Sequence, residues 1–403
     1  MINLEIPPRL KGMIHLASEV AESMLRPISR KYDTHEHTYP VELDVFGKIL
    51  QGMEDGGQGV GASHISKKEE NDAGEKCVKN GKNMLAVLTL FEMAWGDLGL
   101  TLTIPGQGLG NSAIAAVASA EQKARFSGKW AAMAITEPGA GSDSSNISTT
   151  AVLDGETWVL NGEKIFVTCG ERADLTVVWA TTDKSKGKVG IKSFVVEKGT
   201  PGFSVERVED KMGIRASDTV SLILRDCRIP KNNLLGKPEV KEDQGFAGAM
   251  QTFDNTRPVV AAMAIGVAKA SLDLTKDFFA REGIEPDYRG SVWDQGAIEA
   301  EIIRMEAELE ASRLLTLKAA WMADNGQPNS KEASMAKAKA GRVGTKISLR
   351  CVELCGAIGY GETELLEKWA RDIKITDIFE GTQQIQQLII ARRLLRKSSK
   401  ELH

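Results

Sequence analysis

Residues 134–143, Ala-Ile-Thr-Glu-Pro-Gly-Ala-Gly-Ser-Asp, lie where the chain passes from a helical pattern to a strand-rich one. The small residues after Pro138 keep side chains out of the way, so backbone N–H groups in this segment can approach a ligand. Thr136 and Ser142 add hydroxyl donors. Taken alone, the segment fits either a ligand-binding loop or a plain inter-domain turn, because Gly-Pro-Ser loops are common.

The chain before this segment, from about residue 10 to about residue 126, has a helical pattern. Apolar residues recur there at the spacing of one helix face: Met13, Leu16, Ala17, Val20 and Met24. Residues 83–98 repeat the pattern. We therefore expect an N-terminal helical domain over residues 1–128.

The chain after this segment contains short β-rich runs separated by turn residues. These runs are residues 175–180, 191–196, 203–208 and 219–224. Two further runs flank Asn161-Gly162, a dipeptide that favours the two-residue turn of a β-hairpin. Regular short strands are typical of a small barrel or sandwich, so we expect a middle β domain over residues 129–245.

The last part of the chain is helical again, and we expect a third domain over residues 246–403. Thr256-Arg257-Pro258 is predicted to open a helix that reaches about residue 280, because proline suits a first helical turn. Residues 299–323 and 331–354 are long amphipathic runs, and residues 383–396 form a last helix. Four such helices with short connections predict a bundle.

Composition excludes several classes of protein. The 403 residues suggest two or three domains, and a net charge of −4 with a pI of about 5.9 does not indicate nucleic-acid binding. Five irregularly spaced cysteines indicate reduced thiols, and His35 and His37 lack the convergent ligands of a metal site. No run approaches the roughly 18 apolar residues of a membrane span, and no signal segment is recognised. We expect a cytoplasmic protein with no membrane, metal or nucleic-acid partner.

Two segments near the C-terminal helices carry charged residues in informative places. Glu380 stands just before a glycine and just after Ile378-Phe379, and burial there would raise its pKa and make it a stronger base. The alternative is an acid favoured by a helix N-terminus. Arg257, at a predicted helix start, suits phosphate or carboxylate binding, or an ordinary salt bridge.

Together these segments resemble the acyl-CoA dehydrogenases, and most closely their medium-chain and short-chain branch. Four runs are specific to that family: Thr-Glu-Pro-Gly-Ala-Gly-Ser-Asp at 136–143, Asn-Gly-Glu-Lys at 161–164, Lys-Met-Gly-Ile-Arg at 211–215 and Phe-Glu-Gly-Thr-Gln at 379–383. The resemblance covers nearly the whole chain. It implies an α+β fold with an N-terminal all-α domain, a middle β-barrel domain and a C-terminal four-helix bundle.

The resemblance also implies roles. Glu380 would remove the α-proton of an acyl-CoA while the β-hydride passes to N5 of FAD, which yields the trans-2-enoyl-CoA. A second branch of the family places its base near Thr256, but no acid stands at residues 259–263. The implied FAD contacts are Ile135, Thr136, Gly141, Ser142, Phe166, Thr168, Arg281, Gly356, Thr382 and Gln384. The implied substrate contacts are Ser142, Asp254, Arg257 and Gly381.

The resemblance further implies a homotetramer, arranged as a dimer of dimers, and an electron-transferring flavoprotein that reoxidises the reduced flavin. Two other functions stay open. One is a flavin oxidase or monooxygenase of the same fold, although the retained base disfavours it. The other is a non-catalytic partner subunit.

The chain departs from the family pattern at three places. The usual Arg-x-x-Phe-Gly run, whose arginine holds the FAD pyrophosphate of a neighbouring subunit, is absent, and Arg281 is favoured over Arg289 for that role. Glu353 stands where relatives often carry glutamine, and an ionised carboxylate would repel a pyrophosphate. Residues 69–82 look inserted near the expected acyl pocket, so the chain length of the acyl group stays open.

Overall fold

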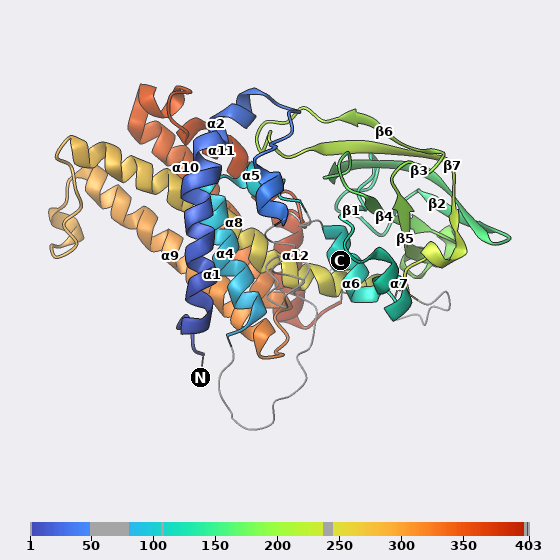
Figure 1. Cartoon of the computed structure of the whole chain (residues 1–403). Coiled ribbons are helices and arrows are strands. Elements are labelled where there is room, and N and C mark those ends of the chain that lie inside the picture. The colour runs from blue at the N-terminus through green and yellow to red at the C-terminus, as the bar shows by residue number, and fades with distance from the viewer. Residues whose placement is uncertain (1, 49–79, 106–108, 237–244, 399–400, 402–403) are drawn as a thin grey trace.

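The computed structural model describes residues 2–48, 80–105, 109–236, 245–398 and 401, and among these the side chains of residues 245–255 and 292 are not described. The inserted-looking segment at 69–82 therefore falls almost entirely outside the described residues. Long helices gather on one side of the molecule and the strands on the other (Figure 1). This arrangement confirms the α+β fold with helical regions on both sides of a β region in the sequence.

Helix α1, the π-helical turn that follows it and α5 pack against α4, whereas α6 lies against two strands of the sheet. Pro8 stands in the first turn of α1, where a backbone N–H would make no hydrogen bond within the helix, so the lack of an N–H on proline costs nothing. Gly266 of the long helix α8 (Gly245–Arg281) allows α4 to pack closely, since a Cβ there would lie 2.3 Å from the carbonyl oxygen of Phe91. The elements are α1 (Pro8–Val20), a π-helical turn (Ala21–Leu25), α2 (Arg26–Thr34), α4 (Lys82–Gly96), α5 (Leu98–Thr101), α6 (Leu109–Val117) and α7 (Ala120–Phe126).

The strands form one curled seven-stranded sheet with the order β1-β4-β2-β3-β7-β6, and β5 pairs with β4. β1 runs parallel to β4, whereas the β2–β3, β3–β7, β4–β5 and β6–β7 pairs are antiparallel. Its apolar side chains form a separate core. The strands are β1 (Ala131–Ala134), β2 (Thr150–Asp154), β3 (Thr157–Thr168), β4 (Leu175–Thr181), β5 (Ile191–Glu197), β6 (Phe203–Val208) and β7 (Thr219–Pro230).

The predicted hairpin at Asn161-Gly162 is wrong. Both residues lie inside the continuous strand β3, beside a shift of register against β7. Gly162 is required by close packing instead of by a turn, because a Cβ there would lie 2.4 Å from the hydroxyl oxygen of Thr149. The side-chain oxygen of Asn161 accepts a hydrogen bond from the backbone N–H of Asp226 at 2.8 Å. The dipeptide therefore forms part of a β-bulge within β3 and does not form a hairpin turn.

The C-terminal helices pack around α10, which contacts α8, α9 and α12. α8 begins at Gly245, so Pro258 lies inside the helix and does not open it, contrary to the prediction. The predicted last helix at 383–396 is confirmed as α12. The elements are α8 (Gly245–Arg281), α9 (Ala297–Asp324), α10 (Ser330–Tyr360), α11 (Leu366–Asp372), a 3₁₀ helix η6 (Ile373–Asp377) and α12 (Gln383–Leu395).

One part of α8 corrects the expectation that no segment is apolar enough for a membrane span. Residues Thr256–Arg281 have a mean hydropathy of 1.4 over the most apolar window, and 83% of that window is buried inside the protein. The neighbouring helices α4, α9 and α10 therefore cover this apolar surface.

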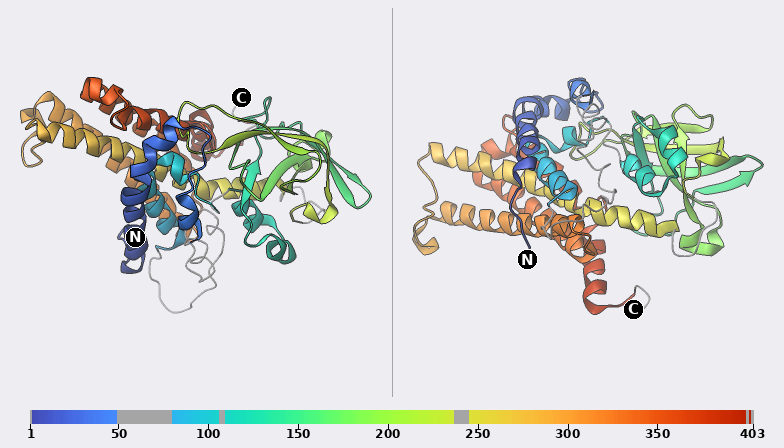
Figure 2. Two further views of the ribbon diagram at one scale, coloured as in Figure 1. Left: turned by 45° about the horizontal axis from the view of Figure 1, so that its top comes forward. Right: turned by 60° about the horizontal axis from the view of Figure 1, so that its bottom comes forward.

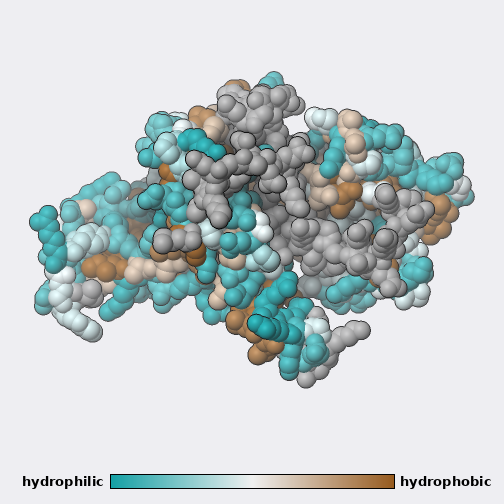
Figure 3. Space-filling view, turned by 90° about the horizontal axis from the view of Figure 1, so that it is seen from below, coloured by the Kyte–Doolittle hydropathy of each residue, from teal (hydrophilic) through white to brown (hydrophobic). Residues whose placement is uncertain are grey.

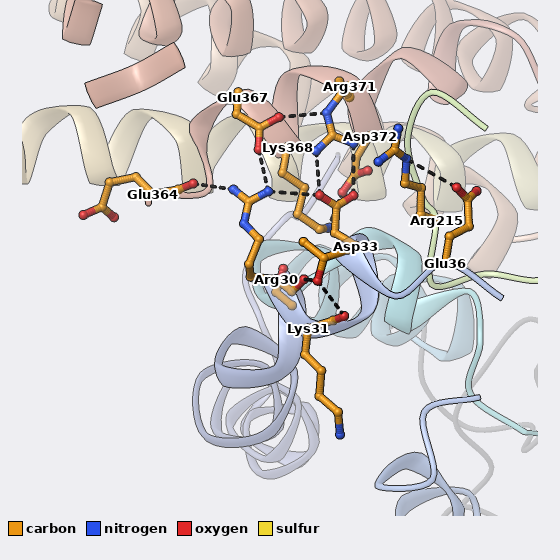
Figure 4. A network of polar contacts seen from close by, with 12 residues as sticks. Arg30, Lys31, Asp33, Glu36, Arg215, Glu364, Glu367, Lys368, Arg371 and Asp372 are labelled. Atoms are coloured by element: carbon orange, nitrogen blue, oxygen red, sulfur yellow. Dashed lines mark hydrogen bonds and ion pairs between the residues drawn. The ribbon is translucent and has the colours of Figure 1, made fainter. Parts of the chain in front are cut away.

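A buried network of ion pairs joins α11 to the N-terminal helices (Figure 4). Lys368 lies within 2.6 Å of Asp97 and 2.5 Å of Asp372, and all three side chains are fully or almost fully buried. Nearer the surface, Arg371 contacts Asp33 of α2 at 2.6 Å. The network fixes α11 immediately before the segment that carries Glu380.

The Lys211–Arg215 motif is anchored to the same helix. The backbone N–H of Ile214 donates to Asp372 at 2.5 Å, and Arg371 donates to the carbonyl oxygen of Met212 at 3.0 Å. Gly213 is needed there, since a Cβ would lie 2.5 Å from the backbone of Arg371. The motif therefore links the β region to the C-terminal helices.

The cysteine residues that the structure describes form no disulfide, and one histidine lies in a cluster of polar side chains. The four described cysteines, Cys169, Cys227, Cys351 and Cys355, are free and buried. His37 lies with Glu36 and Asp210 in a group whose ligand atoms are within 4.8 Å of one another. Because Glu36 also pairs with Lys211 and Arg215, we interpret the group as an exposed ion-pair cluster.

Candidate active site

Glu380 lies in the short connection between η6 and α12. Its backbone adopts the left-handed conformation, with φ at 57°, which is uncommon for a residue other than glycine and costs conformational energy. Thr382 caps α12 by accepting a hydrogen bond from the backbone N–H of Ile385. Glu380 precedes that cap, so the alternative of an acid held by the helix N-terminus does not describe its position.

The carboxylate of Glu380 is turned toward the middle of α8. The hydroxyl group of Thr256 donates a short hydrogen bond to Oε2 of Glu380. Burial raises the pKa of Glu380, while the Thr256 hydroxyl and the charges of Lys337 and Arg257 oppose that rise. The side chain is therefore a stronger proton acceptor than an exposed glutamate, and it must be ionised to act as a base.

Side chains from two helices hold the backbone around Glu380. Gln386 donates to the carbonyl oxygens of Glu380 and Gly381 at 3.1 and 3.0 Å. Lys337 of α10 donates to the carbonyl oxygens of Thr376 and Gly381 at 3.0 and 2.7 Å. Gly381 has a φ of 91°, and a Cβ at this position would lie 2.7 Å from the side-chain nitrogen of Gln386, so only glycine leaves room for that amide. The strained conformation of Glu380 is thus held by its surroundings.

The segment at 135–142 is fixed by a buried ion pair. Nζ of Lys164 lies 2.8 Å from Oε1 of Glu137, and both side chains are almost fully buried. Glu137 also accepts from the backbone N–H groups of Ser148 at 2.5 Å and Thr149 at 2.9 Å. Lys164 donates further to the carbonyl oxygen of Ile135 at 3.0 Å. Glu137 therefore orders the segment and does not face a ligand.

Glu137→Gln is expected to destabilise the protein by about 3–5 kcal/mol, because it leaves the Lys164 ammonium group buried without its counter-charge. Burial favours the neutral acid, but Lys164, Ser148 and Thr149 outweigh it and hold the pKa of Glu137 down to about 2. Stability from this group is present above the ordinary pKa near 4.5 and is lost as the pH falls toward about 2. Urea unfolding at pH 7 and pH 3 measures both effects.

The matched control is Glu163→Gln, which makes the same change at the neighbouring, partly exposed residue on β3. We expect this variant to differ from wild type by less than about 1 kcal/mol. Equal losses in the two variants would contradict the role of the Glu137–Lys164 pair.

Phe166 lies beside this segment and points outward. The backbone N–H of Ile165 donates to the carbonyl oxygen of Thr136 at 2.9 Å, which places Thr136 next to Phe166. A bulge between Lys164 and Val167 lies at Phe166, whose φ is 54°, and this residue is 59% exposed. Bulges commonly re-aim a side chain next to a functional site.

The exposed ring suits the flat face of a flavin, and the hydroxyl groups of Thr136 and Thr168 suit its polar edge. Gly139 and Gly141 have open space where a Cβ would lie, so backbone N–H groups there are approachable. On these observations the residues present fit a bound flavin.

The structure does not bring all the predicted residues together within one chain. Arg281 ends α8, and Gly356 interrupts α10 with φ at 55°. The α8–α9 connection and the end of α10 lie at the end of the bundle that is farthest from the sheet (Figure 1). Ser142 and Gln384 are exposed, and the side chain of Asp254 lies outside the described residues. Arg281 and Gly356 therefore cannot serve the same flavin as Thr136 in a single chain.

Glu353 does not present the uncompensated charge that was expected. Its carboxylate lies 2.7 Å from Nη1 of Arg350, one turn earlier on α10, and Arg350 also pairs with Glu301 at 3.3 Å. The hydrogen bond to Glu353 raises the pKa of Arg350. This pairing reduces the repulsion that Glu353 would exert on a nearby pyrophosphate.

The residues that hold Glu380 were not identified from the sequence. Thr256 stands next to Arg257 in a quoted motif, but its hydroxyl cannot be placed against Glu380 without the fold. Lys337 is one of several lysines on a helix, and nothing in the local pattern marks it as buried. Gln386 follows the Glu380 motif closely, which is the one available signal.

Comparisons with known proteins identify relatives over nearly the full chain. The family models for the middle and C-terminal domains of acyl-CoA dehydrogenases match residues 132–227 and 243–395. The chain is 35% identical over 405 residues to the mitochondrial short-chain specific acyl-CoA dehydrogenase of Mus musculus, covering 98% of this chain and 92% of that protein. It is also 35% identical over 390 residues to the acryloyl-CoA reductase (NADH) of Anaerotignum propionicum, covering 95% and 93%. The solved butyryl-CoA dehydrogenase of Megasphaera elsdenii has a TM-score of 0.83 and 31% identity, covering 98% of this chain and 100% of that one.

Proposed function

Because the chain belongs to the acyl-CoA dehydrogenase family, we propose that it oxidises a short-chain acyl-CoA to the trans-2-enoyl-CoA with Glu380 as the base. Acyl-CoA dehydrogenation is the activity in the names of two relatives that match this chain along nearly their whole length. The preference for a short acyl group is supported by the names of two of them, a short-chain enzyme and a butyryl-CoA dehydrogenase.

The observation that carries the proposal is the placement of the Glu380 carboxylate. It is partly buried and accepts a hydrogen bond from Thr256, and its backbone is held in a strained conformation by Lys337 and Gln386. Strain that the surroundings maintain is typical of functional sites. Arg257, which is 5% exposed, adds a buried positive charge next to Thr256.

Glu380 would accept the α-proton of the thioester. This C–H group is a very weak acid, so the developing charge on the thioester oxygen must meet placed hydrogen-bond donors. The resemblance assigns one of these donors to the backbone N–H of Glu380. Gln386 and Lys337 fix the carbonyl groups that follow it, so this part of the backbone is preorganised.

The family's members are FAD flavoproteins, and FAD supplies the acceptor for the β-hydride when bound. On this chain, Thr136, Phe166 and Thr168 would hold the flavin ring from the sheet side, with Ile135, Gly141 and Ser142 in the same segment. Thr382 and Gln384 would contact it from the start of α12. Arg257, with Asp254, would lie along the CoA part of the substrate, and Ser142 and Gly381 would also contact the substrate.

A homotetramer, arranged as a dimer of dimers, would explain why some of the expected FAD contacts lie far from Thr136 within one chain. Arg281 and Gly356 lie at the far end of the bundle, where they could contact the FAD of a second copy. α12 extends from the bundle toward the C-terminus (Figure 2), and one of several small apolar patches lies on the projection at the lower edge of the view from below (Figure 3). The exposed apolar residues of α12 are Leu388, Leu394 and Leu395. A second copy that covers them would remove this apolar surface from water.

The direction of the reaction has a second candidate. The acryloyl-CoA reductase relative is as similar to this chain as the mouse dehydrogenase. A carboxylate that accepts an α-proton in one direction returns it in the other, so the same Glu380 suits enoyl-CoA reduction. For the oxidative direction we propose an electron-transferring flavoprotein as the acceptor.

The test uses the purified FAD-loaded protein with a panel of acyl-CoAs from four to eight carbons and an artificial electron acceptor. We expect trans-2-enoyl-CoA, identified by mass spectrometry, with the highest rate for the shortest chain. Oxygen consumption without the acceptor would instead support an oxidase, and enoyl-CoA reduction that is much faster than oxidation would support a reductase. No product from any thioester would support a non-catalytic subunit and overturn the proposal.

A further inference from the structure

Lys337 is a buried cation whose positive charge the proposed chemistry has not yet used. It lies on α10 and is 2% exposed. Its two hydrogen-bond acceptors are neutral carbonyl oxygens, those of Thr376 at 3.0 Å and Gly381 at 2.7 Å. Burying an ammonium group against neutral acceptors costs stability that an apolar residue would not cost. A position that retains such a charge is a candidate for function.

The two acceptors lie on either side of Glu380. Thr376 belongs to η6, and Gly381 directly follows Glu380. One ammonium group therefore joins the two ends of the segment that carries the carboxylate. Gln386 reinforces only the second end, through the carbonyl oxygens of Glu380 and Gly381.

The charge of Lys337 also acts on Glu380 directly. The charged groups that face Lys337 are Glu380 in the connection, Asp377 on η6 and Arg257 on α8. Burial lowers the pKa of Lys337 to about 8, while Glu380 and Asp377 oppose this shift, so the group is still mainly charged at neutral pH. The positive charge in turn opposes the rise that burial causes in the pKa of Glu380.

We propose that Lys337 is a positioning residue for the α-proton transfer, which fixes the backbone on both sides of Glu380 and holds a buried positive charge near its carboxylate. This inference rests on the proposed function. Two of the three N–H donors of Lys337 are bound to backbone carbonyl oxygens, so the role assigned to this side chain is to hold the backbone and not to exchange a proton with the substrate.

The test compares Lys337→Met with wild type in stopped-flow reduction of the bound flavin by butyryl-CoA, without oxygen, from pH 5 to pH 9. In wild type the rate falls at low pH as Glu380 becomes protonated. Loss of the nearby positive charge raises the pKa of Glu380, so this fall is expected to move upward by on the order of one pH unit. The affinity for butyryl-CoA is expected to change less than about threefold, since Lys337 contacts the protein backbone and not the substrate.

The matched control is Lys339→Met, which makes the same change two residues along α10 at a half-exposed lysine that pairs with Glu308. Its pH profile is expected to match wild type. Lys337→Gln keeps a hydrogen-bond donor but removes the charge. Its pH profile is therefore expected to shift as that of Lys337→Met does, while its maximal rate of flavin reduction is expected to fall less than that of Lys337→Met. If Lys337→Met does not fold, Lys337→Gln provides the same test of the charge.

A second readout does not require oxidation. Methylthioacetyl-CoA has sulfur at the β position, so it carries exchangeable α-hydrogens but no β-hydride to lose. Deuterium uptake from D₂O at its α-carbon, followed by mass spectrometry, is expected to shift with pH in the same way. Unchanged profiles in both Lys337 variants would overturn the inference. Wild-type flavin that no acyl-CoA reduces would instead count against the proposed function itself.

Discussion

Replacing Glu380 with glutamine is expected to slow the reduction of bound flavin by an acyl-CoA about 10²–10⁴-fold, the usual contribution of a general base. Glutamine keeps the size and one acceptor oxygen, so the hydrogen bond from Thr256 is retained. The variant should therefore fold, bind FAD and bind acyl-CoA. Rapid-mixing absorbance of the flavin measures the rate, and a ligand titration measures the affinity.

The control for Glu380→Gln is Glu310→Gln, the same change at an exposed acid of α9 that pairs with Arg313. This variant is expected to reduce its flavin at the wild-type rate. A Glu380→Gln protein that retains more than about one tenth of the wild-type rate would show that another group accepts the proton.

Replacing Lys368 with methionine is expected to give the largest loss of stability, about 3–5 kcal/mol or more. Burial disfavours the charge of Lys368, but Asp372 and Asp97 outweigh that effect and raise its pKa. The stability that this lysine contributes is therefore fully present below its ordinary pKa of 10.5 and persists across the physiological range. The substitution leaves two carboxylates buried without a counter-charge. Urea unfolding of the FAD-loaded protein, monitored by circular dichroism, measures the loss.

Lys374→Met provides the comparison for Lys368→Met, since Lys374 is a half-exposed lysine of η6 whose pairing with Asp377 contributes about 0–1 kcal/mol. A further variant, Lys368→Met with Asp97→Asn and Asp372→Asn, is expected to recover part of the stability by removing the unpaired charges. Similar unfolding midpoints for Lys368→Met and Lys374→Met would contradict the structural role of the buried network.

The order of helical and strand-rich regions follows from the sequence because apolar periodicity is local. Ala17 and Val20, which the pattern assigns to one helix face, are buried in α1, whereas Leu16 of the same pattern is 38% exposed. Predictions from local residue preferences were wrong where a contact with a distant part of the chain decides the conformation. Asn161-Gly162 favours a turn in isolation, but Gly162 is packed against Thr149 and β3 continues through it. Pro258 suits a helix start, yet α8 extends upstream to Gly245.

The candidate site was predictable in part. Glu380 was recognised from its motif, and the burial that raises its pKa follows from its apolar neighbours. The groups that hold it come from α8, α10 and α12, and their convergence depends on how three helices pack. The sequence-based expectation treated the charge of Glu353 as unpaired. Its ion pair with Arg350 forms because residues three apart lie on the same side of a helix, and the helix had to be known first. The site residues taken from the resemblance remain predictions.

The most direct test of the account is a single-turnover titration of the FAD-loaded protein with butyryl-CoA in the absence of oxygen, with wild type and Glu380→Gln side by side. The flavin absorbance near ~450 nm reports its own redox state. We expect the absorbance of wild type to fall as trans-2-enoyl-CoA forms and the absorbance of Glu380→Gln to stay constant over the same time. A wild-type flavin that no acyl-CoA reduces, or a Glu380→Gln flavin that is reduced equally fast, would contradict it.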